Sequence, residues 1–246
     1  MMRYCLLLAA ALCVMNVQAA DLPPAFRADY IIKKGPFELG RSSRELSYGD
    51  NGELVFRTDS QSAGLVSLFY SEQISETTRM QQADGRVVPI EYRYQRDGRR
   101  KRTISQQFDW ANGNVTSQVD GTVYEFALDE HALDQNGYQV NLMIDLAKGL
   151  RDISYPVARK NKMRRYEISH IGNERIETVL GAIDTVVIQR KEDKITTMWC
   201  APDLYFLPVK IQHEEDGSVF TAYLHSLAGL RLTAERVPVS TKNNDN

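Results

Sequence analysis

Asp-Gly and Asn-Gly pairs divide this chain into short segments, several of which alternate between apolar and polar residues. Alternation with a period of two is typical of a β-strand with one buried face. The two dipeptides supply the positive φ angles that tight hairpin turns require. The pairs are Asn51-Gly52, Asp84-Gly85, Asp97-Gly98, Asn112-Gly113, Asp120-Gly121 and Asp216-Gly217. The pattern predicts a β-meander over residues 88–128 and further antiparallel hairpins on either side of it.

Two neighbouring segments of the meander carry apolar side chains on one parity, which assigns those side chains to one face of the sheet. They are Val88, Ile90, Tyr92 and Tyr94 in the first segment, and Ile104, Phe108 and Trp110 in the second. We expect this face to point into the core.

One helix is expected between Asp134 and Leu150. Asp134 is a good N-cap residue, and Gly149 stands where helices often end. Between them, apolar residues recur at spacings of three and four, which predicts a single buried stripe. The stripe consists of Tyr138, Leu142, Met143, Leu146 and Leu150. The expected fold is therefore mainly β with one principal helix: a strongly curved antiparallel sheet, an unclosed β-barrel, with the helix packed in its concave face.

Residues 1–19 have the features of a secretory signal peptide. Arg3 supplies a positive charge, an apolar run follows over residues 5–15, and Ala19 is a small residue at the expected cleavage position. The run is about half of the roughly 20 residues that a membrane-spanning helix needs, which disfavours an anchor. We expect a single β-rich domain over residues 20–237 and a disordered tail over residues 238–246.

Cleavage after Ala19 would remove Cys5 and Cys13 and leave only Cys200, so that no disulfide could form within the mature chain. An exported domain without disulfides is more typical of the periplasm of Gram-negative bacteria than of a eukaryotic secretory route. The balance of 30 Lys and Arg against 32 Asp and Glu gives no basis for a nucleic-acid partner. The sequence therefore predicts a periplasmic protein that does not bind nucleic acid.

Sequence motifs give little support for catalysis. The sequence has no nucleophile elbow, phosphate-binding loop, dinucleotide fingerprint or zinc-protease motif. Its four histidines are scattered without metal-ligand spacing. Cys200 would need a neighbouring base to act as a nucleophile. No catalytic residue, metal site or cofactor is predicted.

The densest basic run is Arg99, Arg100, Lys101 and Arg102, which follows the Asp97-Gly98 turn. A solvated turn is the simpler interpretation of such a run. Positive charge at one edge of a mildly acidic protein also favours contact with anionic lipid headgroups. The sequence leaves both interpretations open.

A nearly continuous apolar segment over residues 63–70 suggests a cap or lid on the sheet. Together with the aromatic faces of the meander and the helix, it predicts a ligand site, although an ordinary packed core would use the same residues. The candidate binding residues are Leu65, Phe69, Tyr92, Tyr94, Phe108, Trp110, Tyr138 and Leu142.

Several stretches resemble an exported bacterial family known as domain of unknown function 3108. They include residues 26–30 (FRADY), 88–94 (VPIEYRY), 199–203 (WCAPD) and 207–211 (LPVKI). The resemblance spans nearly the whole mature chain. It implies a periplasmic protein without an established activity and a fold similar to the open β-barrels of periplasmic lipoprotein carriers. It assigns no catalytic residues.

These observations favour a periplasmic protein that binds or carries a hydrophobic ligand, a lipid or an acyl chain. The alternative is a structural or protein-interaction module of the cell envelope that uses exposed sheet edges. A hydrolase acting on envelope polymers is the least favoured hypothesis.

Signal-peptide cleavage gives the first testable prediction. Protein recovered from the periplasm should begin at Ala20, because Ala19 provides the small residue that signal peptidase recognises. N-terminal sequencing and intact mass measurement check this, with cytoplasmic precursor as the unprocessed reference. Periplasmic protein that still carries residues 1–19 would contradict the prediction.

Overall fold

The computed structural model describes residues 22–64, 71–83, 85–192 and 194–232. The first eight strands are β1 (Phe26–Lys34), β2 (Phe37–Tyr48), β3 (Leu54–Ser62), β4 (Gln73–Ala83), β5 (Arg86–Asp97), β6 (Arg102–Asp109), β7 (Asn114–Val119) and β8 (Thr122–Ala127). The others are β9 (Leu133–Asp134), β10 (Ile153–Arg159), β11 (Lys162–Thr178), β12 (Gly181–Lys191), β13 (Ile195–Ala201), β14 (Leu207–Glu215) and β15 (Ser218–Ala228). The helices are α1 (Tyr138–Ala147) and a short 3-10 helix, η2 (Pro202–Leu204). The predicted signal peptide and tail lie outside the described residues.

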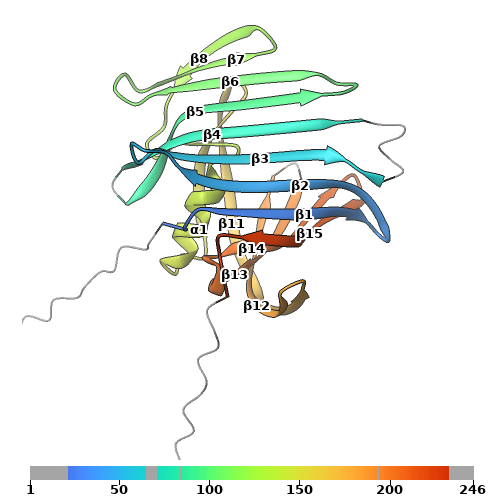
Figure 1. Ribbon diagram of the computed structural model, residues 1–246. Helices are drawn as coiled ribbons and strands as arrows, with labels where there is room; N and C mark the ends of the chain where they lie inside the picture. The colour runs from blue at the N-terminus through green and yellow to red at the C-terminus, as the bar shows by residue number, and fades with distance from the viewer. Residues whose placement is uncertain (1–21, 65–70, 84, 193, 233–246) are drawn as a thin grey trace, which may run out of the picture.

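Within the described ranges, all of these strands belong to one sheet of 15 strands. Its order is β8-β7-β6-β5-β4-β3-β2-β1-β15-β14-β13-β12-β11-β10-β9, so the last strand of the chain pairs with the first. Figure 1 shows β1 to β8 as one wall, with a second wall containing β11 to β14 curving behind it. No ladder joins β8 to β9, which confirms the predicted unclosed barrel. The short pair of β9 with β10 is parallel, in contrast to the antiparallel pairing that we predicted throughout.

In the first half of the first meander segment, the prediction of which side chains face the core is wrong: Val88 and Ile90 are only partly buried. Pairing between β4 and β5 shifts at Ile90, which has no partner residue on β4. This bulge reverses the alternation, because one extra residue exchanges the two faces of a strand. Val87 is therefore fully buried, whereas Val88 is only partly buried. Tyr92, beyond the bulge, faces the core as expected.

The helix is shorter than predicted at both ends, since α1 covers Tyr138–Ala147. Gly137 occupies the N-cap position, and Asp134 belongs to β9 instead. At the other end Gly149 has a φ of 85°. Its amide donates to Leu146 O at 3.0 Å, and the Leu150 amide donates to Asp145 O at 3.0 Å. This pair of bonds is a Schellman motif, which explains why the helix ends at the predicted glycine.

Helix α1 is buried on two sides, whereas the sequence predicted a single stripe. Val140, Met143 and Ile144 pack with β1 to β5 and with part of the second wall, while Leu142 and Leu146 pack with β10 to β13. Leu150, which we assigned to the stripe, is 47% exposed. The helix therefore separates two core clusters inside the curved sheet. None of the described helices has the length and apolar character needed to span a membrane.

A buried polar segment joins the start of α1 to the middle of the first wall. Asp134 Oδ1 accepts hydrogen bonds from the Thr78 hydroxyl at 2.7 Å, the Asn136 amide at 2.9 Å and the Gly137 amide at 2.8 Å. One turn further on, the Asn141 side chain donates to Val87 O at 2.8 Å and accepts from Val87 N at 3.3 Å. Buried polar groups are tolerated when they are paired in this way, so these bonds fix where the helix enters the sheet.

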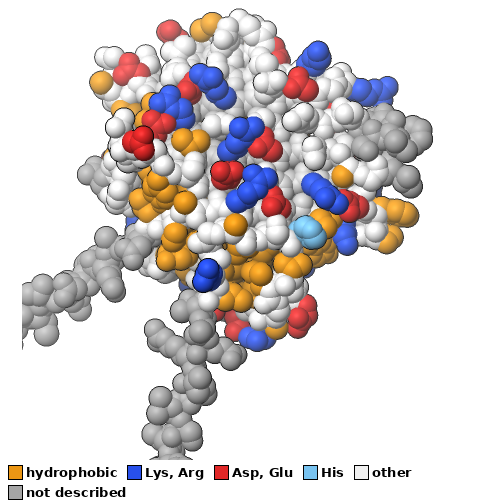
Figure 2. Space-filling view, viewed as in Figure 1, with side chains coloured by type: hydrophobic (Ala, Val, Ile, Leu, Met, Phe, Trp, Pro, Cys, Tyr) orange, Lys and Arg blue, Asp and Glu red, His pale blue; other side chains and the backbone are white. Residues whose placement is uncertain are grey.

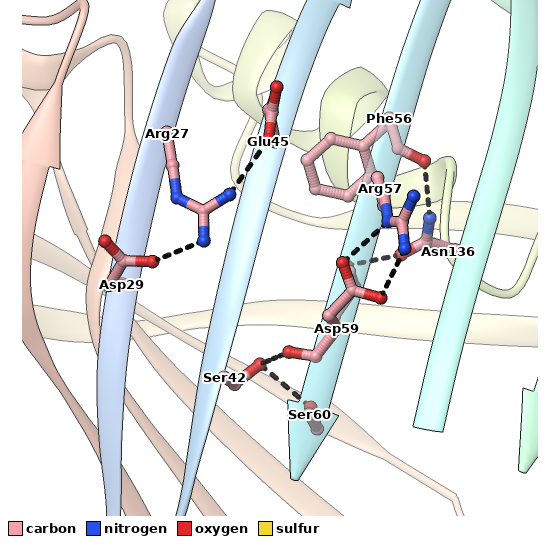
Figure 3. Close-up of polar contacts among 10 residues, drawn as sticks. Arg27, Asp29, Ser42, Glu45, Phe56, Arg57, Asp59, Ser60 and Asn136 are labelled. Carbon is pink, nitrogen blue, oxygen red and sulfur yellow. Dashed lines mark hydrogen bonds and ion pairs between the residues drawn. The ribbon is translucent and has the colours of Figure 1, made fainter. Parts of the chain in front are cut away.

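The outer face of the first wall is polar and carries interspersed charges of both signs (Figure 2). Arg27 contacts both Asp29 and Glu45 at 3.1 Å, as Figure 3 shows. These pairs are substantially exposed, so each contributes little to stability. In the same view Asn136 reaches the Phe56 carbonyl at 3.0 Å, a buried bond that ties the polar segment to β3.

The close fit of the polar segment predicts that Gly137→Ala is destabilising. An added Cβ would lie 2.6 Å from Asp134 Oδ2 and 2.9 Å from Thr78 Cγ2. Overpacking of this kind lowers the free energy of unfolding by about 1 to 3 kcal/mol. Gly49→Ala is the matched control, because its Cβ would meet no atom closer than 3.7 Å. Urea denaturation of both variants checks the difference, and equal stabilities would contradict it.

Candidate ligand-binding cavity

A cavity of about 610 Å³ lies inside the curved sheet, between its two walls. Gln135, Tyr138 and Gln139 line it at the start of α1. The remaining lining comes from inward-facing residues of β2, β4, β5, β6 and β10 to β14, and from the turns after β10 and β12. The cavity therefore collects side chains from nearly every part of the fold. Another hollow, of about 730 Å³, is lined by the β1–β2 hairpin and by Gly64, which precedes residues outside the described ranges.

Cationic side chains dominate the charged lining. They are Arg44, Arg96, Arg102, Arg159, Lys160, Arg190 and Lys194, against only Glu76 and Glu192. Three of the cations contact carboxylates outside the lining: Arg96 with Glu72, Arg102 with Asp120, and Lys194 with Glu215. The four remaining cations are Arg44, Arg159, Lys160 and Arg190.

Arg190 packs against two tyrosine rings that also contact each other edge to face. Its guanidinium carbon is 4.4 Å from the Tyr166 ring centroid and 5.3 Å from that of Tyr138. Its Nη1 donates to the Tyr138 hydroxyl at 2.8 Å. Its Nε is 3.7 Å from Glu192 Oε2, too far for a hydrogen bond. This buried Nε has no hydrogen-bond partner among the described residues.

Arg44 presents a second guanidinium from the other wall. It lies 5.3 Å from the centroid of the Tyr30 ring. The Tyr30 hydroxyl donates to Pro208 O at 2.7 Å, which fixes the ring. Burial raises the pKa of Tyr30 to about 12, so this hydroxyl stays neutral. Arg44 Nη1 is also buried without a hydrogen-bond partner in the described part of the chain.

The pKa values of two basic side chains in the lining are lowered by burial and by neighbouring positive charges. Burial lowers the pKa of Lys160, and the charges of Arg102 and Arg159 lower it further. Burial likewise lowers the pKa of His213, with Lys194 and Arg190 adding to the effect. Burial is the main cause of both shifts, and the neighbouring positive charges add to it because they disfavour a further proton.

Glu76 faces the same cavity from β4. The Tyr92 hydroxyl donates to its Oε2 at 2.7 Å. Desolvation raises the pKa of Glu76 to about 7, against a lowering by the Tyr92 hydrogen bond and the Arg44 charge. Asp134 opposes ionisation of Glu76 in the same direction as burial. The carboxyl is therefore neutral in mild acid and charged in mild alkali.

The structure brings only some of the predicted binding residues to the cavity. Tyr92, Tyr94 and Tyr138 line it. Phe108 and Leu142 are buried in packed clusters, and Trp110 packs against the Phe108 cluster with its indole nitrogen bonded to Pro89 O at 2.8 Å. Leu65 and Phe69 lie outside the described residues.

The mixed lining differs from the apolar one that the sequence suggested, and sequence reasoning missed Arg44, Glu76 and Arg190. A signal was present for Arg190, since it continues the inward parity of Val186 and Ile188 on β12. A charged residue that continues a row of inward-facing apolar residues along a strand indicates that the interior is polar at that point.

The predicted basic run adjoins the cavity through its last residue. Arg99, Arg100 and Lys101 are exposed in the β5–β6 turn, and Arg102 lines the cavity. The Lys160 carbonyl accepts from the side chains of Gln106, at 3.3 Å, and Ser117. These contacts bring the β10–β11 turn, which contains Lys160, against β6 and β7. Contact with anionic lipid headgroups stays a prediction.

Cys200 is fully buried. Burial raises the pKa of its thiol to about 12, so the group is protonated at neutral pH. Among the described residues, no group of three or more histidine, cysteine and acidic side chains could hold a metal ion.

A family model described as "Protein of unknown function (DUF3108)" matches residues 29–225, which confirms the resemblance seen in the sequence. No curated protein matches the sequence. The fold is similar to a crystal structure of a β-barrel-like protein of domain of unknown function DUF1849 from Brucella abortus. The TM-score is 0.55 at 9% identity, with 83% of this chain and 97% of that chain covered. This likeness shows the fold alone.

A DUF1329 family protein from Desulfovibrio piger ATCC 29098 matches with a TM-score of 0.25 and 10% identity. The match covers 85% of this chain and 87% of that chain. A TM-score this low carries no argument.

Glu76 predicts a pH-dependent stability. In the folded state the Glu76 carboxyl keeps its proton up to about pH 7, whereas the same carboxyl with its ordinary pKa of 4.5 loses the proton near pH 4.5. The free energy of unfolding, measured relative to Glu76→Gln, should therefore fall as the pH rises across this interval. Tyr92→Phe should move the fall to higher pH, because the tyrosine hydrogen bond lowers the pKa of Glu76. Urea titrations at several pH values check this, and a difference that does not vary with pH would contradict it.

Proposed function

We propose that this chain, which belongs to the DUF3108 family, is an exported binding protein that carries a lipid or other acyl-chain ligand in the periplasm. The observation that carries the proposal is the cavity of about 610 Å³ between the curved sheet and α1. Ligand sites of proteins commonly have volumes of about 300 to 1,000 Å³. The cavity is thus large enough for part of a small amphiphile.

The lining supports an amphiphilic ligand. Its aromatic and apolar side chains are Tyr92, Tyr94, Ile104, Tyr138, Tyr166, Met198 and Ile211. They share the cavity with the cationic side chains described above. Aromatic and aliphatic groups contact an acyl chain favourably, and tyrosine offers both an apolar ring and a polar hydroxyl. A ligand with an apolar chain and a polar head would match both kinds of lining.

The periplasmic location rests on the signal peptide predicted over residues 1–19. In that compartment lipids must cross an aqueous space between two membranes, which gives a carrier a role. The proposal concerns binding rather than catalysis.

A role in protein interaction is the second candidate, favoured by the exposed edge of the sheet. β8 is the terminal strand in the sheet order, and among the described strands it pairs only with β7. Val123 on this strand is 58% exposed. An unpaired edge is the surface used in β-augmentation. A stoichiometric partner crosslinked at β8, from protein that contains no lipid, would support this function over the carrier.

Acyl-chain binding is tested with dansyl-labelled undecanoic acid. The mature protein should enhance the fluorescence of the probe. Gln135→Trp should weaken binding by about tenfold or more, because the indole would fill part of the cavity beside α1. Protein purified from the periplasm should also release lipid on solvent extraction.

Gln118→Trp is the matched control. Gln118 is exposed on β7, between the inward-facing Ser117 and Val119. Equal effects of the two substitutions would place the probe outside the cavity. A wild-type protein that neither binds the probe nor contains extractable lipid would refute the carrier function.

A further inference from the structure

We infer that the polar head of the ligand is an anion, a phosphate or a carboxylate, bound by the guanidinium groups of Arg44 and Arg190. The inference rests on the proposed function, since it names the chemical class of ligand for the same cavity. The two arginines come from β2 and β12, on different walls of the sheet.

The first support is the set of buried polar atoms without a hydrogen-bond partner. In the described residues these atoms are Arg44 Nη1, Gln106 Oε1, Asp134 Oδ2 and Arg190 Nε. Both donors in this set are guanidinium nitrogens, and both arginines line the cavity. Buried donors are nearly always paired in folded proteins, and an unpaired charged donor is especially unfavourable. Both guanidinium groups therefore retain hydrogen-bonding capacity that no described residue uses.

The second support is the way in which Arg190 is held. Its side chain is only 15% exposed, and its guanidinium is held by Tyr138 and Tyr166. Guanidinium groups bind carboxylates and phosphates through parallel hydrogen bonds. A guanidinium already held against two rings and hydrogen-bonded to the Tyr138 hydroxyl loses little further conformational freedom when it binds, which favours recognition.

The third support is the weak pairing of the carboxylate nearest to Arg190. Glu192 lies 3.7 Å from Arg190 Nε and 3.7 Å from Arg159 Nη1. Both distances exceed those of a hydrogen bond, so Glu192 does not saturate either guanidinium. The lining as a whole carries more cationic than anionic side chains, and these cations add to the effect of burial in lowering the pKa values of Lys160 and His213. A ligand anion would neutralise that excess of positive charge.

The test compares ligands that share one feature at a time. Dodecyl phosphate has both the chain and the anion, dodecanol has the same chain with a neutral head, and inorganic phosphate has the anion alone. Calorimetric titration of the full mature protein should give the highest affinity for dodecyl phosphate, at least about tenfold above that for dodecanol.

Arg44→Gln provides the variant arm. Arg44 Nη1 has no hydrogen-bond partner to lose, so the fold should be kept. Affinity for dodecyl phosphate should fall by roughly tenfold or more, while affinity for dodecanol should be unchanged. Arg41→Gln is the control on the same strand, since Arg41 is exposed and pairs with Glu38. The comparison of the three ligands on the wild type needs no variant, so it stands if a variant fails to fold.

Each outcome separates the two proposals. Equal affinity for dodecyl phosphate and dodecanol would overturn the anionic head and leave the carrier function standing. Inorganic phosphate bound as tightly as dodecyl phosphate, and weakened by Arg44→Gln, would support the anion site and contradict the carrier function. Binding of none of the three ligands would overturn both.

Discussion

The hydrogen bonds of Asp134 determine how the inside of this barrel is divided. One carboxylate oxygen joins Thr78 in the first wall to the backbone amides of Asn136 and Gly137, immediately before α1. Asn141 then pairs with the backbone of Val87 next to the β5 bulge. These contacts hold the helix between the walls, where both of its sides are buried. The position of the helix limits the cavity to the space beside the N-terminal turn of α1.

The interior beyond the helix carries charge instead of a packed apolar core. Inward-facing Arg44, Glu76 and Arg190 lose hydration there, as the raised pKa of Glu76 shows. Buried charge opposes folding unless it is paired, and residues with perturbed pKa values gather at functional sites more often than elsewhere. The stability lost in this half of the interior is offset by the two apolar clusters on either side of α1. This division gives the interior an apolar part beside α1 and a polar part around the cavity.

The sequence predicted the sheet and the helix well where the signal is local. Hairpin turns at Asn112-Gly113 and Asp120-Gly121 join the strands that were expected, and Gly149 ends the helix region. The prediction of buried side chains failed in β5, where one extra residue exchanges the two faces of the strand. The bulge at Ile90 depends on how β4 pairs with β5. Pro89 beside it is a local sign of an interrupted strand, but the alternation of residues does not show where the faces exchange. Likewise, Tyr92 and Phe108 share the predicted face, but only Tyr92 reaches the cavity.

The alternation of residues and the turn dipeptides by themselves determined a curved, mainly antiparallel sheet with one helix, because each strand and turn is encoded over a few neighbouring residues. Family membership followed from short stretches of sequence in the same way. Only the tertiary structure decided that Arg44 and Arg190, 146 positions apart in the chain, line one cavity. That meeting depends on the pairing of β15 with β1 and on the curl of the whole sheet, which are long-range contacts that no local pattern carries.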